Sequence, residues 1–324
     1  MHLLVPFASD TSEACQHVLR DLSLPRLESL LALLEPASRD EGDAFSFSPP
    51  HERALAAAWH WQGGDGTLPF AAQAAAGDGI ATGDNAWALL TPAHWQLGRD
   101  HVTLLDPDAL DLDAAESRAL FNAIEDLFAS EGFAVAWGAA GRWYAARDDL
   151  QGFATASIDR VVGRGVDRWL RESARGGESP GKSEGKSAIA SLVRRLQSEA
   201  QLVFYTQAVN EAREERGALA VNSFWLSGCG RHQPAPAVST PELVSELRGP
   251  LLAGDWASWA EAWRALDGGA VDGVLRAARD GVAVTLTLCG ERSAVRLETR
   301  ARPLWQRLAS GWRRSDATGL LAAL

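Results

Sequence analysis

The stretch TQAVNEAREERGALAVNSFWLSGCGRHQPAP, residues 206–236, combines patterns that together indicate the fold class. A charged run with helical spacing precedes the apolar run VNSFWLSG, which is typical of a buried strand. Cys229 then lies between two glycines, and the exit is basic and rich in proline. Glycines at a strand end let the backbone turn or approach a ligand. The stretch therefore predicts either the edge of a binding site or the end of a core strand.

Strand-like and helix-like segments alternate on both sides of this stretch, and such alternation is typical of α/β layering. We expect an α/β fold in which a central, mostly parallel sheet is flanked by helices. Residues 1–172 and 188–324 would supply the two parts of this core, and the polar stretch 173–187 would be a flexible linker or loop. Residues 36–50 are predicted to be a loop, whereas 239–254 and 303–314 are predicted to be helices.

Composition excludes several classes of function. The chain has 324 residues, 46% of them hydrophobic, and a formal net charge of −11, which disfavours nucleic-acid binding. No apolar run approaches the roughly 20 residues of a membrane span, and the amino terminus lacks the pattern of a secretory signal. Cys15, Cys229 and Cys289 are few, odd in number and far apart. Such cysteines predict reduced thiols in a cytoplasmic protein.

Tryptophan is unusually common, with 13 residues in the chain. Trp256, Trp259 and Trp263 share one face of a predicted helix. Large aromatic side chains fill cores as readily as they form interfaces. The stripe therefore predicts either a core helix or, if it is exposed, a surface for a protein partner.

Candidate catalytic residues are few. Asp10 and Ser12 follow the first predicted strand, at the kind of edge where α/β sheets bind ligands, but both residue types also cap helices. No G-x-S-x-G motif is present. The run HWQLGRDH, residues 94–101, gathers polar side chains without a recognised metal-ligand spacing. A reactive Cys229 thiolate would need a neighbouring positive charge, which Arg231 or His232 could supply.

Read in order, several stretches resemble the archaeal-type, cofactor-independent phosphoglycerate mutases of the alkaline-phosphatase superfamily. QAVNEAREERGALAVNSFWLSGCG is similar to their N…R…G…aN…LLRGaG segment, and GDGIATGDNAWALLTPAHWQL resembles the stretch that carries GD.afR.N. The resemblance covers about residues 1–235. It also extends to a bacterial group labelled phosphoglycerate-mutase-like or RpfE-type regulatory proteins. The matching positions in the first segment are Asn210, Arg213, Gly217, Asn222, Gly228 and Gly230.

The departures from the family concern its chemistry. The resemblance implies a serine nucleophile and two metal ions held by aspartate and histidine, which would stabilise the attacking and leaving oxygens of phosphoryl transfer. The first strand here ends in PFASD, so Asp10 is the only remnant of the family's motif there, and Ser48 is displaced from the nucleophile position. Residues 236–324 contain no histidine. We therefore expect the family's alkaline-phosphatase-like scaffold without its two-metal site.

These observations predict a non-catalytic or altered regulatory protein that binds a ligand and needs no cofactor. A phosphorylated small molecule or another anion would be held by hydrogen bonds, and a protein partner is the other expectation. Two alternatives stay open: a phosphomutase or phosphatase that uses Mn or Mg, and an interaction module built on the Trp-rich C-terminal third. The predicted ligand-binding residues are Arg53, Arg99, His101, Asn210, Arg213, Asn222 and Cys229; the metal ligands under the enzyme alternative would be Asp10, His51, Asp84, Asp100 and His101; the candidate catalytic residues are Asp10, Ser12 and Ser48.

Overall fold

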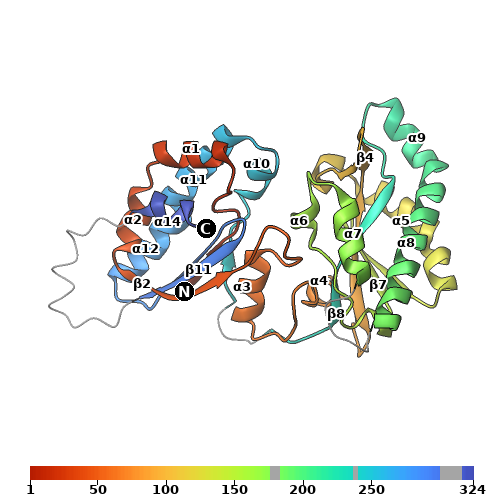
Figure 1. Cartoon of the computed structure of the whole chain (residues 1–324), viewed down its shortest axis with the longest axis horizontal. Helices are drawn as coiled ribbons and strands as arrows, with labels where there is room; N and C mark the ends of the chain where they lie inside the picture. The colour runs from red at the N-terminus through yellow and green to blue at the C-terminus, as the bar shows by residue number, and fades with distance from the viewer. Residues whose placement is uncertain (176–182, 236–239, 300–315) are drawn as a thin grey trace. The chain divides into compact units, whose positions relative to one another are not determined.

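The computed structural model describes residues 1–175, 183–235, 240–299 and 316–324. The chain forms two compact units (Figure 1). Unit 1 comprises residues 1–45, 49–60 and 235–324, and unit 2 comprises residues 46–48 and 61–234. Each unit has its own sheet and its own core. The predicted division at residues 173–187 therefore falls inside unit 2 and does not separate the two units.

Unit 1 contains a mixed sheet of five strands in the order β2-β11-β10-β1-β9. Strand β1 is parallel to both of its neighbours, whereas β10 with β11 and β11 with β2 are antiparallel. The strands are β1 (His2–Val5), β2 (Leu34–Glu41), β9 (Glu242–Leu243), β10 (Thr285–Cys289) and β11 (Ser293–Thr299). Edge strand β2 corrects the first part of the predicted loop at 36–50, whereas residues 42–49 lie outside helices and strands as predicted. The strand is mostly exposed and lacks the alternation that marks a half-buried strand.

Helices pack on one face of this sheet and bury its alternating apolar side chains. They are α1 (Glu13–Asp21), α2 (Pro25–Leu31), α11 (Trp256–Leu266), α12 (Asp272–Arg279) and α14 (Ala317–Ala322). Trp259 and Trp263 are fully buried, and their indole nitrogens donate to backbone oxygens of Phe7 and Ala8. Trp256 packs against the same core. The tryptophan stripe is thus a core feature of unit 1.

Two predictions for the C-terminal part had different outcomes. The predicted helix at 239–254 is confirmed only in its last part, where the chain forms α10 (Arg248–Leu252). Its first described residues form β9 beside β1 instead. The edge of the β1 strand offers hydrogen-bond partners that the local sequence cannot reveal. The predicted helix at 303–314 lies outside the described residues.

Unit 2 contains an antiparallel sheet of four strands in the order β6-β7-β3-β8 and a separate hairpin. The run VNSFWLSG enters strand β8 at Ser223, as a strand was predicted there, and β8 pairs with β3. Neither unit thus has the mostly parallel sheet that was predicted, although the fold is a mixed α/β one. The strands are β3 (Ala86–Ala93), β6 (Ala134–Ala139), β7 (Arg142–Ala146) and β8 (Ser223–Arg231), and the hairpin consists of β4 (Trp95–Leu97) and β5 (Val102–Leu104).

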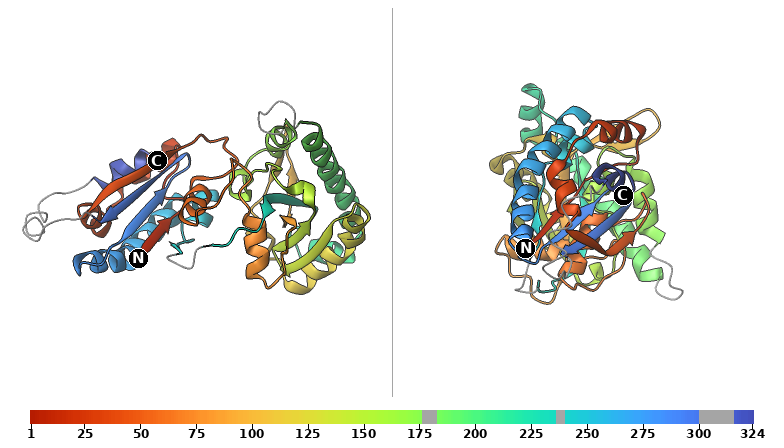
Figure 2. Two further views of the ribbon diagram at one scale, coloured as in Figure 1. Left: turned by 90° about the horizontal axis from the view of Figure 1, so that it is seen from below. Right: turned by 90° about the vertical axis from the view of Figure 1, so that its left-hand side faces the viewer.

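Helices cover both faces of the unit 2 sheet. Helices α5 (Ala114–Ser130) and α8 (Ser183–Tyr205) bury one face, and the alanine-rich α4 (Phe70–Gly77) packs on the other. Figure 2 shows the long α8, in green, along one side of this unit. Asp113 and Glu116 form a capping box that fixes the start of α5. The described residues also form α3 (Pro50–Ala58) in unit 1 and α6 (Ile158–Val161), α7 (Val166–Arg175) and α9 (Ala208–Glu215) in unit 2.

The predicted linker at 173–187 is partly helical. Residues 173–175 end α7, and residues 183–187 begin α8, whereas 176–182 lie outside the described residues. Within the described part of the chain, no helix is long and apolar enough to cross a membrane.

Candidate functional site: a groove in unit 2

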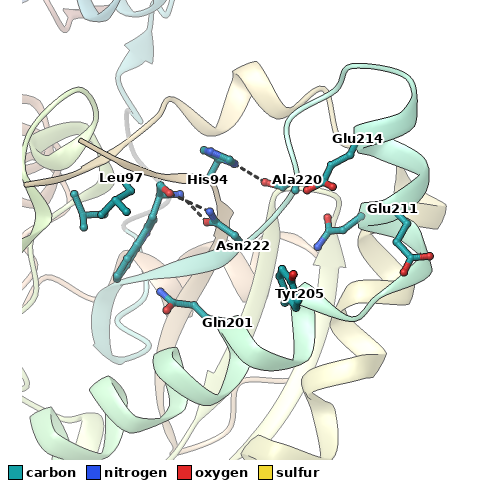
Figure 3. Close-up of a pocket in the computed structure, with 11 residues that line it drawn as sticks. His94, Leu97, Gln201, Tyr205, Glu211, Glu214, Ala220 and Asn222 are labelled. Atoms are coloured by element: carbon teal, nitrogen blue, oxygen red, sulfur yellow. Dashed lines mark hydrogen bonds between the residues drawn. The ribbon is translucent and has the colours of Figure 1, made fainter. Parts of the chain in front are cut away.

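The main cavity of interest is a groove in unit 2 with a volume of about 660 Å³ (Figure 3). This volume lies within the range of small-molecule sites. One side of the groove is the β4–β5 hairpin, and the other is the corner where α8 gives way to α9 and then to β8. The residues that line it are His94, Trp95, Leu97, Val102, Gln201, Tyr205, Asn210, Glu211, Glu214, Ala220 and Asn222.

The hairpin side of the groove is fixed by Asn222, the residue before β8. Its side-chain oxygen accepts from the Trp95 amide at 2.7 Å, and its side-chain nitrogen donates to the Trp95 carbonyl at 3.0 Å. The Asn222 side chain thus bonds both backbone groups of Trp95, as a neighbouring strand would. His94 adds a ring-nitrogen contact of 2.7 Å to the Ala220 carbonyl. The start of the hairpin is therefore held against the end of the α9–β8 connection.

The helical side is fixed by Asn210 on α9. Its side-chain nitrogen donates to the carbonyls of Phe204 at 2.9 Å and Val221 at 2.8 Å, and its oxygen accepts from the Val221 amide at 2.9 Å. Asn210 is buried. One amide side chain therefore ties the end of α8 to the approach of β8, and all of these bonds lie inside the protein.

Arg213 lies behind the groove, and its side chain is fully buried. The guanidinium donates to the Leu219 carbonyl at 2.8 Å, to the Leu110 carbonyl and to the carboxylate of Glu116. Glu116 also pairs with Arg216. Arg213 thus links α9 to α5, and its donors are directed at the protein and not at the groove.

The open surface of the groove is apolar and acidic. The Tyr205 and Leu97 side chains are among the most exposed large hydrophobic ones, at 86% and 84%. Glu211 and Glu214 are exposed, and neither carboxylate has an ion-pair or hydrogen-bond partner in the part of the chain that the structure describes. Figure 3 shows these two carboxylates and Tyr205 on one side of the groove and Leu97 on the other. Such a surface can hold a positive charge next to an aromatic ring and an aliphatic body.

The predicted ligand-binding residues do not gather into one site. Asn210 and Asn222 line the groove, but their polar atoms bond the backbone around it. Arg99 and His101 lie exposed in the turn between β4 and β5. Arg53 belongs to α3 of unit 1, where it pairs with Asp40 at 2.7 Å.

Cys229 is a core residue of unit 2 with no exposed surface. Burial raises the pKa of its thiol to about 12, although a contact of 3.8 Å from the Thr155 hydroxyl acts in the opposite direction. A thiol of this kind stays protonated and unreactive at neutral pH. The glycines beside it serve packing: Gly228 has φ +68°, and a Cβ there would lie 2.8 Å from the Ala71 amide nitrogen of α4.

The candidate catalytic residues have structural contacts in the two units. Asp10 accepts from the Ser12 amide at 2.7 Å, and Ser12 caps α1, so both organise that helix start. Ser48 is buried, and its hydroxyl accepts from the Gly66 amide at 2.9 Å. These contacts match the alternative interpretation of Asp10 and Ser12 as helix-capping residues.

The candidate metal ligands do not converge. Asp10 and His51 belong to unit 1, and the His51 ring lies 5.1 Å from that of Phe7. Asp84, Asp100 and His101 belong to unit 2, where all three are exposed. Among the described residues, no group of at least three His, Cys, Asp or Glu side chains is placed to hold a metal ion.

Sequence reasoning missed the side chains that give the groove its character. Trp95 lies in the run HWQLGRDH, where only the charged and histidine residues were considered. Glu211 and Glu214 are three residues apart, which places them on one helix face, and this spacing is a usable signal. Tyr205 could not be identified because an aromatic residue late in an amphipathic helix more often faces the core.

Comparisons with known proteins give likenesses to solved structures. Neither a protein-family model nor a curated protein matches the chain. A cofactor-independent phosphoglycerate mutase from Thermoplasma acidophilum DSM 1728 is similar with a TM-score of 0.35 and 15% identity, over 99% of this chain and 98% of that one. The PH0037 protein from Pyrococcus horikoshii is similar with a TM-score of 0.43 and 12% identity, over 92% and 87%. Both TM-scores and both identities are low, so neither likeness indicates a function for this chain.

Proposed function

We propose that this chain is a non-catalytic binding protein and that the unit 2 groove is its ligand site. The ligand class that fits best is an organic cation, an amine or guanidinium carried on an apolar body. The observation that carries this proposal is the pair of unpartnered carboxylates, Glu211 and Glu214, beside the exposed Tyr205 and Leu97. Neither carboxylate has an ion-pair or hydrogen-bond partner among the residues that the structure describes.

Charge decides between a cationic and an anionic ligand. The groove lining contains two carboxylates and no arginine or lysine. The net charge of −11 adds a long-range field that attracts cations and repels phosphate esters. Arg213, the cation nearest in sequence, is fully buried and already paired with Glu116. A phosphorylated metabolite would therefore meet repulsion from two carboxylates in the groove, whose lining offers no arginine or lysine to compensate.

We further propose that the scaffold derives from a phosphoglycerate-mutase-like, alkaline-phosphatase-related ancestor and now has a regulatory role. Support comes from residues at which the sequence resembles that family. Asn210, Arg213 and Asn222 bond the walls of the groove, so their side chains have an architectural use that does not require phosphoryl transfer. No observation favours the metal-dependent enzyme or the tryptophan-based interaction module over this proposal.

The test is calorimetric titration with tryptamine and agmatine as cationic probes and 3-phosphoglycerate as the anionic one. We expect the cationic probes to bind and 3-phosphoglycerate not to bind. The double variant Glu211→Gln/Glu214→Gln should weaken cation binding roughly tenfold, since each partly solvated charge contact is worth about 0.5–1 kcal/mol. Glu215→Gln is the matched control, because Glu215 is on the same helix but does not line the groove. Binding of 3-phosphoglycerate alone, or equal effects of the double variant and the control, would contradict the proposal.

A further inference from the structure

The apolar surface around the groove extends beyond the cavity. Leu202 on α8 does not line the groove, yet its side chain is 74% exposed. It lies three residues before Tyr205, which places both side chains on one face of the helix. Leu97 is on the opposite, hairpin side. We define the patch as Leu97, Leu202 and Tyr205.

A small molecule seated in the groove would not cover the patch. Leu202 lies outside the lining, and the Leu97 and Tyr205 side chains are mostly exposed although they border the cavity. Isolated exposed apolar residues need no explanation, but a group of large ones at the rim of a groove is typical of a protein-interaction surface. The occupant is therefore expected to be larger than the cavity.

The charges define the chemistry of that occupant. Glu211 and Glu214 are at the α9 side of the patch, three residues apart, and both carboxylates are unpartnered among the described residues. A partner that buries the patch must bring apolar side chains, and one that reaches these carboxylates gains by carrying lysine or arginine beside them. Basic residues flanking an apolar stripe are the pattern of an amphipathic helix that docks in a groove.

We infer that the groove and the patch together bind a basic, amphipathic peptide segment of a partner protein. This inference rests on the proposed function and names its ligand. The cationic side chain of the segment occupies the groove beside Glu211 and Glu214, and its apolar face covers the patch.

The experiment measures the fluorescence anisotropy of a labelled 14-residue Leu/Lys amphipathic peptide on the full chain. A scrambled peptide of equal composition is the control for nonspecific charge attraction. We expect the patterned peptide to bind at least tenfold more tightly than the scrambled one. Leu202→Gln should weaken peptide binding by about tenfold, since burial of one leucine is lost. The same variant should leave tryptamine binding unchanged, because Leu202 lies outside the groove.

The matched control is Leu243→Gln, which replaces an exposed leucine of unit 1 that does not belong to the patch. This variant should leave peptide binding unchanged. Equal binding of patterned and scrambled peptides would overturn the inference, as would an unchanged affinity in Leu202→Gln. If tryptamine binds and the patterned peptide does not, the inference fails and the proposed function stands. If neither binds, both fail.

Discussion

Replacement of Asn210 by alanine tests whether this residue is a structural tie or a ligand contact. The substitution removes all three side-chain hydrogen bonds that join α9 to Phe204 and Val221. The Phe204 carbonyl still accepts a hydrogen bond from the Gln207 amide. The amide and the carbonyl of Val221 both lose their hydrogen bonds to the Asn210 side chain. At about 1 kcal/mol for each bond, Asn210→Ala should lower the free energy of unfolding by about 3 kcal/mol.

The assay is urea unfolding followed by circular dichroism, with Gln201→Ala as the matched control. Gln201 also lines the groove, but its amide has no hydrogen bond in the described chain. For Asn210→Ala we expect the unfolding midpoint of unit 2 to fall by about 1–2 M urea. For Gln201→Ala the free energy of unfolding should change by less than about 0.5 kcal/mol, while cation binding weakens. The reasoning is refuted if Asn210→Ala keeps its stability and loses only the ligand.

Three further predictions concern packing and protonation. Gly228→Ala should lower the free energy of unfolding by at least about 2 kcal/mol, because the residue has positive φ and its new Cβ would lie 2.8 Å from the Ala71 amide nitrogen of α4. Gly217→Ala is the control: it also has positive φ, +76°, but its Cβ would meet open space, so the free energy of unfolding should fall by only about 1 kcal/mol. All three thiols should resist Ellman's reagent at pH 8 until the protein unfolds, because burial raises their pKa values, that of Cys229 to about 12; rapid labelling of the folded chain would contradict this. Burial, then Arg296 and the amino terminus, lower the pKa of His2 to about 4 against the opposing charge of Glu298. The unfolded chain therefore binds one proton more than the folded chain between about pH 6.5 and 4, and the free energy of unfolding should fall by up to about 1.4 kcal/mol for each pH unit that the pH is lowered through this window. His2→Gln should flatten this pH dependence in thermal melts.

Local pattern identified most of the elements of unit 2. The apolar run VNSFWLSG was predicted to be a strand, and the structure places most of it in β8. The aspartate cap of α5 and the glycines between β6 and β7 are further local signals that the sequence carries for the elements observed there. Strand β2 was not predictable, because it is an edge strand whose exposed side chains carry no alternation and whose partner β11 is about 250 residues away in sequence. Long-range pairing of this kind is a tertiary property.

The sequence indicated the stretch of chain that borders the candidate site, but it predicted an arginine-lined site for an anion, whereas the groove is lined by two carboxylates. The stretch 206–236 borders the groove through residues between Asn210 and Asn222, so its interpretation as the edge of a site is kept in the proposal. Its glycine end is instead a core strand, with Cys229 in the interior. Arg213, one of the arginines expected to meet an anion, instead pairs with Glu116, which is 97 residues away, and local pattern cannot reveal a partner at that distance. Burial of that pair leaves the carboxylates of α9 as the exposed charge.

The central claim is that the unit 2 groove binds a cationic ligand. The most direct measurement is the indole ¹⁵N–¹H resonance of Trp95, assigned by its loss in Trp95→Phe, during titration with tryptamine. Trp95 lines the groove and is the first residue of the hairpin, where Asn222 bonds its backbone. The account predicts a saturable shift of this resonance that Glu211→Gln/Glu214→Gln weakens and Glu215→Gln does not. An unmoved Trp95 resonance at saturating tryptamine, or a shift that appears only with 3-phosphoglycerate, would contradict it.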